Sequence, residues 1–261
     1  SGHSFTPAAL TDGTMLRIEA LNRILEIDRV TGRVRVEAGI TLGDLNRRLD
    51  RHGLALENLG DIDRQTLAGA ISTATHGTGA RWRNLSAQVE AIELVTADGV
   101  LHELSGGDEL RAARVGIGAL GAIYAVTLRA IPSFRIDRTD RTRPLAEVIA
   151  SIGELAAAYD HFEFYVFPHT ETALCRESTR TDAAISRLAA AGAGVSHKVD
   201  HSFRVFASER HLKFTEMEYC VPRACAREAV EGVLEIANRR ELAVAFPIEV
   251  RFALSKEDLN T

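Results

Sequence analysis

The segment 68–79, AGAISTATHGTG, constrains the fold of this chain more than any other stretch. Ala and Gly make up half of its residues, and hydroxyl side chains supply most of the rest. Such small side chains leave backbone N–H groups accessible, and N–H groups together with hydroxyls bind anionic oxygens such as those of a pyrophosphate. A tightly packed turn with capping hydroxyls needs the same composition. The segment therefore predicts either a cradle for an anionic ligand or a close-packed turn, and His76 is either a contact in that cradle or a satisfied core histidine.

The first half of the chain has the patterns of short strands with one clear helix. Residues 32–39, GRVRVEAG, alternate between apolar and charged, which predicts a half-buried strand. Residues 41–53 have a capping Thr, a leucine face and a terminal Gly, which predict a helix. Residues 91–104 contain a central Asp-Gly that predicts a hairpin, and residues 122–131 predict another strand.

The composition changes after residue 132, and we place a domain boundary near residues 133–145. This stretch includes the charged run DRTDRTRP, which we interpret as irregular. Beyond it, strands are predicted at 161–170, 213–222 and 246–254, with a helix starting at Pro222 and running to about residue 239. This order favours an α+β domain with helices on one face of a sheet.

Composition and charge exclude several classes of protein. The net charge is −5 with both signs interspersed, so nucleic acid is not an expected partner. Three cysteines, Cys175, Cys220 and Cys225, have no framework spacing, which argues for a reducing compartment and against a metal site. No apolar stretch approaches the roughly 20 residues of a membrane span. We expect a cytoplasmic protein without an integral membrane span, and leave peripheral association with a membrane open.

A glycine motif, GIGALG at residues 116–121, matches the G-x-G-x-x-G pattern of dinucleotide-binding sites. In a nicotinamide site a strand precedes the motif and a helix follows it. Here the preceding residues look helical and the following ones look like a strand, so we reject a nicotinamide site. The glycines still indicate that the backbone passes close to a neighbour.

Two short motifs near the ends of the chain carry chemically capable side chains. SGHSF at residues 1–5 contains His3, whose imidazole nitrogen can form a covalent bond, although a lone histidine is more often a hydrogen-bonding group. In the strand 246–254, Glu249 and Arg251 are two residues apart and share a face. A surface ion pair is the ordinary interpretation. The functional one is a fixed cation, held by a carboxylate and directed at developing negative charge.

Taken together, SGHSFTP, NLGDIDRQTLAGAISTATHGTG, GIGALGAIYAVTLRAIP, HFEFYVFPHT, EMEYCVP and PIEVRF resemble one family in order along the chain. It is the aldonolactone oxidase and alditol oxidase group of the vanillyl-alcohol-oxidase FAD-binding superfamily, which contains L-gulono-1,4-lactone oxidase and D-arabinono-1,4-lactone oxidase. The resemblance implies an α+β, two-domain, PCMH-type flavoprotein. Residues 1–132 would form the FAD-binding domain and residues 133–261 the α+β substrate or cap domain. The family's first βα unit and its C-terminal lysine segment have no counterpart in this sequence, so we expect a truncated chain.

By the same resemblance, His3 would carry the flavin covalently, and Glu249 and Arg251 would be the catalytic pair that also contacts substrate. Asp61 would lie at the substrate, at a position where alditol oxidases have a serine, which points toward a lactone. Backbone and hydroxyl groups of the remaining motif residues would hold the FAD. The full cofactor-binding set implied by the resemblance is Gly2, His3, Ser4, Phe5, Asp61, Ala70, Thr73, Ala74, Thr75, His76, Gly77 and Ile123.

The function implied by the resemblance is FAD-dependent oxidation of a CH–OH group of a sugar 1,4-lactone, by hydride transfer to flavin N5. The electrons would pass to oxygen or another acceptor. Three alternatives stay open at this point: an alditol oxidase acting on a polyol, a glycolate- or lactate-type FAD dehydrogenase, and an inactive flavin-fold fragment that acts as a binding module.

Overall fold

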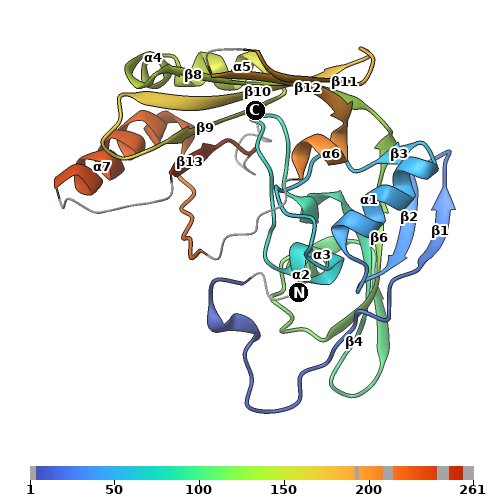
Figure 1. Ribbon diagram of the computed structural model, residues 1–261. Helices are drawn as coiled ribbons and strands as arrows, with labels where there is room; N and C mark the ends of the chain where they lie inside the picture. Colours follow the sequence, from blue (N-terminus) through green and yellow to red (C-terminus); the bar gives the residue numbers. More distant parts are fainter. Residues whose placement is uncertain (1–3, 192–193, 208–213, 240–246, 255–261) are drawn as a thin grey trace. The chain divides into compact units, whose positions relative to one another are not determined.

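The computed structural model describes residues 4–191, 194–207, 214–239 and 247–254 (Figure 1). The chain divides into two compact units that exchange short segments. The first unit comprises Ser1–His76, Arg83–Ser133 and Phe206–Met217, and the second comprises Gly77–Trp82, Phe134–Val205 and Glu218–Thr261.

The first unit is built on a five-stranded antiparallel sheet. Its strand order is β1 (Ile24–Asp28), β2 (Arg33–Glu37), β6 (Ala122–Arg129), β4 (Val89–Val95) and β5 (Leu101–Leu104). Val34 and Val36 on β2 are fully buried, as their alternation with charged residues predicts. The hairpin between β4 and β5 turns at Gly99, which has a φ of +80°. These strand predictions are confirmed.

Helices and a small second sheet complete the first unit. They are α1 (Leu42–Arg51), α2 (Leu67–Ser72), α3 (Gly107–Arg114), the 3-10 turns η1 (Pro7–Ala9) and η2 (Leu85–Gln88), and the pair β3 (Leu54–Ala55) and β7 (Ile131–Pro132). The Thr41 hydroxyl caps α1 by accepting the Asp44 N–H at 3.2 Å, and Gly53 follows the helix with a φ of +71°. Both ends of this helix are therefore set by local sequence.

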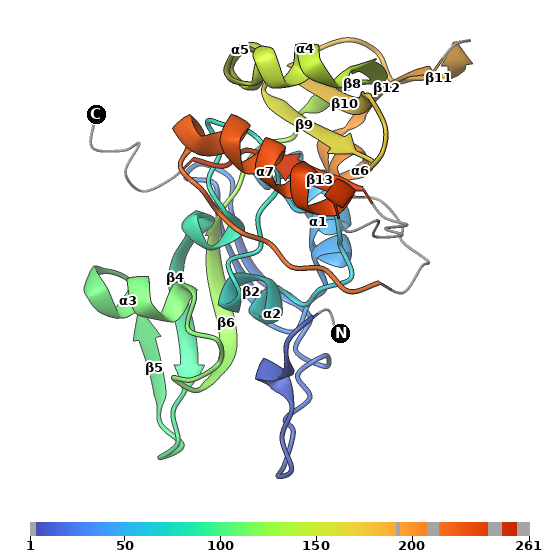
Figure 2. The same ribbon diagram turned by 90° about the vertical axis from the view of Figure 1, so that its left-hand side faces the viewer.

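The second unit is built on a six-stranded antiparallel sheet. Its strand order is β11 (Ser186–Ala191), β12 (Val195–His201), β8 (Arg135–Pro144), β10 (Thr172–Thr181), β9 (His161–Val166) and β13 (Ile248–Arg251). Its helices are α4 (Leu145–Ala150), α5 (Ile152–Ala158), α6 (Ser202–Phe206), η3 (Arg223–Cys225) and α7 (Ala226–Arg239), and Figure 2 shows α7 along β9 and β13.

One face of the second sheet forms an apolar core, and this leaves the other face to polar groups. Phe162, Phe164 and Val166 on β9 pack in one cluster with residues of β10, α4, α5 and α7. Since side chains alternate along a strand, His161, Glu163 and Tyr165 project from the opposite face. We call that side, which carries the odd-numbered residues of β9, the polar face.

Two interpretations of the second half are wrong. The run DRTDRTRP is not irregular but lies in β8, a ten-residue strand between β10 and β12. Its charges are tolerated because neighbouring strands supply partners; for example, the Arg143 Nη2 lies 2.5 Å from the Glu177 Oε1. The strand predicted at 213–222 is also absent from its described part, residues 214–222, where Met217 and Tyr219 are both 82% exposed.

Candidate functional site

The small-residue segment ends α2 in a turn of unusual backbone. Ala74 has a φ of +55°, a left-handed conformation that residues other than Gly rarely adopt. The Thr75 N–H donates to the Ala70 carbonyl at 3.0 Å, and the Thr73 hydroxyl donates to the Gly69 carbonyl at 3.1 Å. The Thr75 hydroxyl contacts the Gln65 amide at 3.2 Å. Hydroxyls that the sequence assigned to a cofactor therefore also shape the turn itself.

Other loops of the first unit converge on this turn. The Leu85 N–H donates to the Thr75 carbonyl at 2.9 Å, and the Ile117 N–H donates to the Ser72 carbonyl at 3.2 Å. A Cβ built on Gly60 would lie 3.1 Å from the His76 carbonyl oxygen, so the loop that leads into Asp61 runs against His76. The fold thus brings together three of the sequence motifs: the small-residue segment, the NLGD loop and the glycine motif.

The glycine motif and Val115, the residue before it, present apolar side chains beside this turn. Val115, Ile117 and Leu120 are 41%, 64% and 47% exposed, and Ile117 has a φ of +53°. A β-branched residue at positive φ is strained. Exposed apolar side chains next to a turn of small residues and backbone groups suit a ligand with an apolar ring system and an anionic linker. The residues present therefore fit a flavin dinucleotide.

The second part of the small-residue segment, Gly77–Trp82, belongs to the second unit. The Thr78 hydroxyl donates to the Phe162 carbonyl on β9 and accepts the Phe252 N–H at 3.2 Å. Gly79 forms a parallel bridge with Ala253. The segment that forms a single motif in the sequence is thus divided between the two units. Residues up to His76 form the turn that ends α2, and residues from Gly77 on hydrogen-bond to the sheet of the second unit.

The predicted pair Glu249 and Arg251 projects from the polar face of the second sheet. In the β13–β9 register Glu249 is opposite Tyr165 and Arg251 is opposite Glu163. The Arg251 Nη2 lies 2.8 Å from the Glu218 Oε1, and its Nε lies 3.7 Å from the Glu249 Oε1. Both members of the pair are 20% exposed. The pair is therefore held in a charged network rather than free in solvent.

The remaining predicted residues are placed as follows. Ser4 and Phe5 are exposed, and the Phe5 ring lies 5.5 Å from the Phe214 ring. Asp61 is half-buried on its loop, and Ile123 is buried on β6. The assignments of Gly2 and His3, including the covalent flavin link, lie outside the described residues.

His161 is a functional-looking group that the sequence did not single out, and its environment is structural. Its Nδ1 lies 2.9 Å from the Thr78 carbonyl oxygen, and its ring stacks at 5.7 Å on Trp82. Burial lowers the pKa of His161 to about 4, because the charged imidazolium loses its hydration. The histidine is therefore neutral in the folded state at pH values where an unfolded chain begins to bind a proton.

We expect the second unit to lose stability as the pH falls from 6.5 to 4. In that window the unfolded state binds a proton at His161 and the folded state does not, so the contribution of His161 lowers the free energy of unfolding by about 3 kcal/mol, and this contribution levels off below pH 4. Urea titrations at several pH values, followed by fluorescence of Trp82, the chain's single tryptophan, measure this slope. His161→Asn keeps an N–H near the Nδ1 position and should flatten the slope, whereas His102→Asn, at an exposed position on β5, should not. An unchanged slope in His161→Asn would contradict the assignment.

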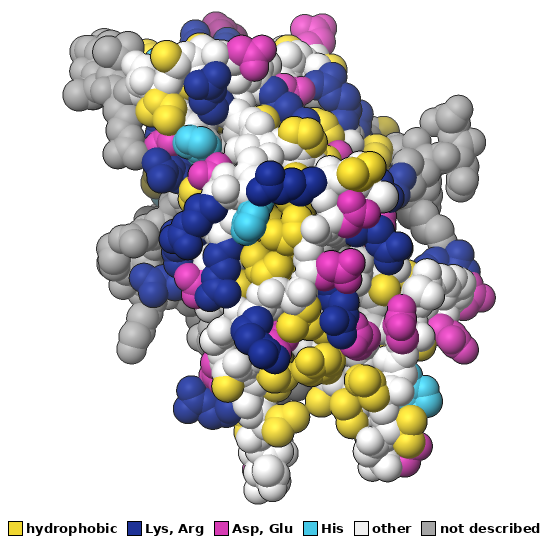
Figure 3. Space-filling view, turned by 90° about the vertical axis from the view of Figure 1, so that its right-hand side faces the viewer, with side chains coloured by type: hydrophobic (Ala, Val, Ile, Leu, Met, Phe, Trp, Pro, Cys, Tyr) yellow, Lys and Arg dark blue, Asp and Glu magenta, His cyan; other side chains and the backbone are white. Residues whose placement is uncertain are grey.

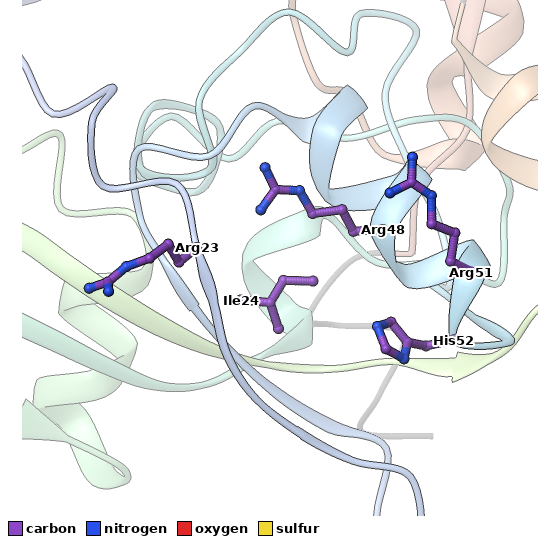
Figure 4. A pocket seen from close by; sticks show the side chains of 5 residues that line it. All are labelled: Arg23, Ile24, Arg48, Arg51 and His52. Atoms are coloured by element: carbon purple, nitrogen blue, oxygen red, sulfur yellow. The ribbon is translucent and has the colours of Figure 1, made fainter.

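A basic hollow in the first unit is not part of this site. On the face that carries α1 and β1, Figure 3 shows an apolar hollow edged by Lys and Arg side chains. A pocket of about 550 Å³ there is lined by Arg23, Ile24, Arg48, Arg51 and His52. Its three guanidinium groups point in different directions (Figure 4). Arg23 is paired with Glu37 at 2.8 Å, so the lining does not converge on a single anion.

Comparisons with known proteins decide the family. Residues 1–105 match the FAD binding domain family, and residues 126–192 and 182–258 match the D-arabinono-1,4-lactone oxidase family. The L-gulono-1,4-lactone dehydrogenase of Mycobacterium tuberculosis is 41% identical over 97% of this chain and 68% of its own length. The chain belongs to the D-arabinono-1,4-lactone oxidase family. The family resemblance inferred from the motifs is confirmed, and with it the FAD cofactor and the oxidoreductase class.

Other members and solved structures extend the comparison. The L-gulonolactone oxidase of Bos taurus is 32% identical over 96% of this chain and 66% of its own length. A cholesterol oxidase from Brevibacterium sterolicum aligns with a TM-score of 0.62 and 19% identity over 71% of this chain and 40% of its own. At that identity the likeness concerns the fold alone, and it supports the predicted α+β, PCMH-type flavoprotein fold. This lactone oxidase family member spans about two thirds of the mycobacterial relative and less than half of the cholesterol oxidase.

Sequence reasoning missed several polar-face residues that surround Glu249 and Arg251. Glu163, Tyr165 and Arg176 lie on β9 and β10 and contact one another, and Tyr165 also contacts Glu249. The available signal was the glutamate in HFEFYV, since a charged residue that alternates with three buried apolar ones marks the second face of a strand.

Along the described part of the chain, no helix is both long and apolar enough to cross a bilayer.

Proposed function

We propose that this chain oxidises a CH–OH group of a sugar 1,4-lactone of the L-gulono or D-arabinono type, with FAD as the oxidant. The observation that carries the proposal is the Glu249–Arg251 pair, which lies on the polar face of a sheet whose other face is an apolar core. A carboxylate and a guanidinium on one face supply the two functions that polyhydroxylated lactones require: an acceptor for hydroxyl groups and a fixed cation.

FAD would supply the chemistry by accepting a hydride at N5, while the substrate hydroxyl loses its proton to a base or to water, and the electrons would then pass to oxygen or another acceptor. We assign its binding to the turn that contains Ala70, Thr73, Ala74, Thr75 and His76, and to neighbouring residues. The supporting observations are the left-handed Ala74 and the exposed apolar side chains beside the turn. Gly77 and Ile123 remain proposed contacts, as do Gly2, Ser4 and Phe5, and His3 is the proposed point of covalent attachment.

The two members of the pair have different roles in this proposal. Arg251 is a planar, permanently charged donor, so it would stabilise the negative charge that the flavin gains when it accepts the hydride. Glu249 accepts hydrogen bonds from the substrate hydroxyls and, 3.7 Å from the Arg251 Nε, helps to orient the guanidinium. Asp61 is a proposed substrate contact.

We place the protein in the cytoplasm, because Cys175, Cys220 and Cys225 are all free thiols.

Anaerobic reduction of the purified flavoprotein tests the proposed function. L-gulono-1,4-lactone or D-arabinono-1,4-lactone is mixed with the enzyme in a stopped-flow instrument, and the absorbance of the oxidised flavin is followed. We expect bleaching that saturates with lactone concentration and is much faster than with xylitol or L-lactate. Faster reduction by xylitol would identify an alditol oxidase, and faster reduction by L-lactate a hydroxy-acid dehydrogenase. A flavin that no compound reduces would contradict the proposal.

A further inference from the structure

A row of alternating charges crosses the polar face of the second unit. In the strand registers Arg251 on β13 is opposite Glu163 on β9, Glu163 is opposite Arg176 on β10, and Arg176 is opposite Asp140 on β8. Asp140 is in turn held by the Arg138 guanidinium at 2.6 Å. Cross-strand pairs of opposite charge stabilise each other. The row therefore fixes the positions of the side chains around Glu249.

The Tyr165 hydroxyl lies between two carboxylates of this face. It is 2.8 Å from the Glu163 Oε1 and 3.2 Å from the Glu249 Oε1. Tyr165 is 9% exposed and Glu163 is 3% exposed, so both are buried. A phenol has a single hydrogen to donate, so the two carboxylates share one donor. A buried carboxylate without a donor is costly, and a second source of hydrogen bonds is needed.

Arg176 supplies that second source. Its Nη1 pairs with the Glu163 Oε1 and also donates to the Tyr165 hydroxyl oxygen at 3.0 Å, and its guanidinium lies 5.3 Å from the centre of the Tyr165 ring. Because Arg176 already satisfies the same oxygen of Glu163, the phenol hydrogen can be given to Glu249 without leaving Glu163 unpaired. The guanidinium also compensates the charge of Glu163, which would otherwise repel Glu249.

We propose that Tyr165 is a positioning residue of the active site, and that its hydroxyl fixes the orientation of the Glu249 carboxylate toward the substrate. Glu163 and Arg176 form the support that holds the Tyr165 hydroxyl in place. This inference rests on the proposed function, because it assigns to Glu249 the substrate hydroxyls. Without the phenol, fewer contacts restrain the Glu249 carboxylate, and a less restrained carboxylate presents its acceptor to the substrate for a smaller fraction of the time.

Tyr165→Phe removes the hydroxyl and keeps the ring. In anaerobic stopped-flow reduction by L-gulono-1,4-lactone, we expect the ratio of the limiting rate constant to the lactone dissociation constant to fall about ten- to a hundredfold, the range for a hydrogen bond to a charged group. A merely structural defect would instead lower the amplitude of bleaching, which reports the fraction of intact holoenzyme, and leave both constants unchanged. Tyr159→Phe is the matched control, since its hydroxyl interacts with Glu177 on the opposite face of the sheet. It should leave both constants near those of the wild type.

A double-mutant cycle tests the contact without any substrate. The losses in Tm of Tyr165→Phe and Glu249→Gln should not add in the double variant if the hydroxyl holds Glu249, whereas the losses of Tyr159→Phe and Glu249→Gln should add. Additive losses for Tyr165 and Glu249, or wild-type kinetic constants in Tyr165→Phe, would overturn the assignment. A wild-type flavin that the lactones fail to reduce would contradict the proposed function instead, and in that case the cycle alone decides whether Tyr165 holds Glu249.

Discussion

Replacing Arg251 with alanine is expected to slow reduction of the bound flavin by the lactone about a hundred- to a thousandfold, the usual cost of losing one preorganised donor at a site of developing charge. The guanidinium is held by Glu218 at 2.8 Å and lies near Glu249 on the polar face, so its position is set before substrate arrives. If its charge acts mainly in the transition state, the rate constant of reduction falls more than the affinity for the lactone. Stopped-flow reduction at several lactone concentrations separates the two.

Two further variants make this experiment decisive. Arg251→Lys should recover only part of the rate, because an ammonium group cannot reproduce the planar fork. Arg143→Ala removes another arginine of the same sheet, one that pairs with Glu177 on the core face. Its folded holoenzyme should be reduced at close to the wild-type rate. Near wild-type reduction of Arg251→Ala would mean that Arg251 and Glu249 form an ordinary ion pair, and the proposed roles would have to be withdrawn.

The largest expected loss of stability follows from Gly79→Ala. Gly79 has a φ of +127°, and a Cβ there would lie 2.3 Å from the Trp82 Cδ1 and 2.7 Å from the Asp160 carbonyl oxygen. The Gly79 N–H also donates to the Phe252 carbonyl at 2.6 Å, so the backbone cannot move aside without losing that bond. Backbone strain and a steric clash together are expected to cost about 4 kcal/mol or more in the free energy of unfolding of the second unit.

Urea unfolding followed by Trp82 fluorescence measures this loss, and a second glycine provides the control. Gly194 has a φ of +77°, but among the described residues the nearest atom to a Cβ there would be the Thr142 Oγ1 at 3.7 Å. Gly194→Ala therefore isolates the backbone term and should cost only about 1–2 kcal/mol. Equal losses for the two variants would show that the close approach at Gly79 relaxes without cost.

Some features of the fold follow from short stretches of sequence. The strand at 33–37 and the helix at 42–51 form where alternation, a capping threonine and a glycine predicted them. The hairpin at Gly99 and the strand at Ile248–Arg251 do likewise. In each case the deciding interactions are between residues a few positions apart, or between one face of an element and any apolar partner. Such signals are present in the sequence itself.

By contrast, local sequence patterns could not identify the charged strand β8 as a strand. The run in β8 was taken for an irregular boundary because five of the eight residues in DRTDRTRP are arginine or aspartate and a sixth is proline. In the fold, Arg138 and Asp140 pair with each other, and Arg143 pairs with Glu177 on β10, 34 residues further along the chain. Whether a charged side chain is satisfied inside a sheet depends on the strand beside it, and no local pattern names that strand.

By itself the sequence determined the local elements, the family with its FAD cofactor and oxidoreductase class, and the two residues proposed for catalysis, because motifs of that kind lie in contiguous residues. Only the tertiary structure decided that the segment 68–79 is shared between two units, with Thr78 bonded to Phe162 on β9, and that Tyr165 lies between Glu163 and Glu249. The Thr78–Phe162 and Tyr165–Glu249 contacts each join residues 84 positions apart. They depend on strand pairing and register, which the packing of a whole sheet selects and which a single strand does not encode.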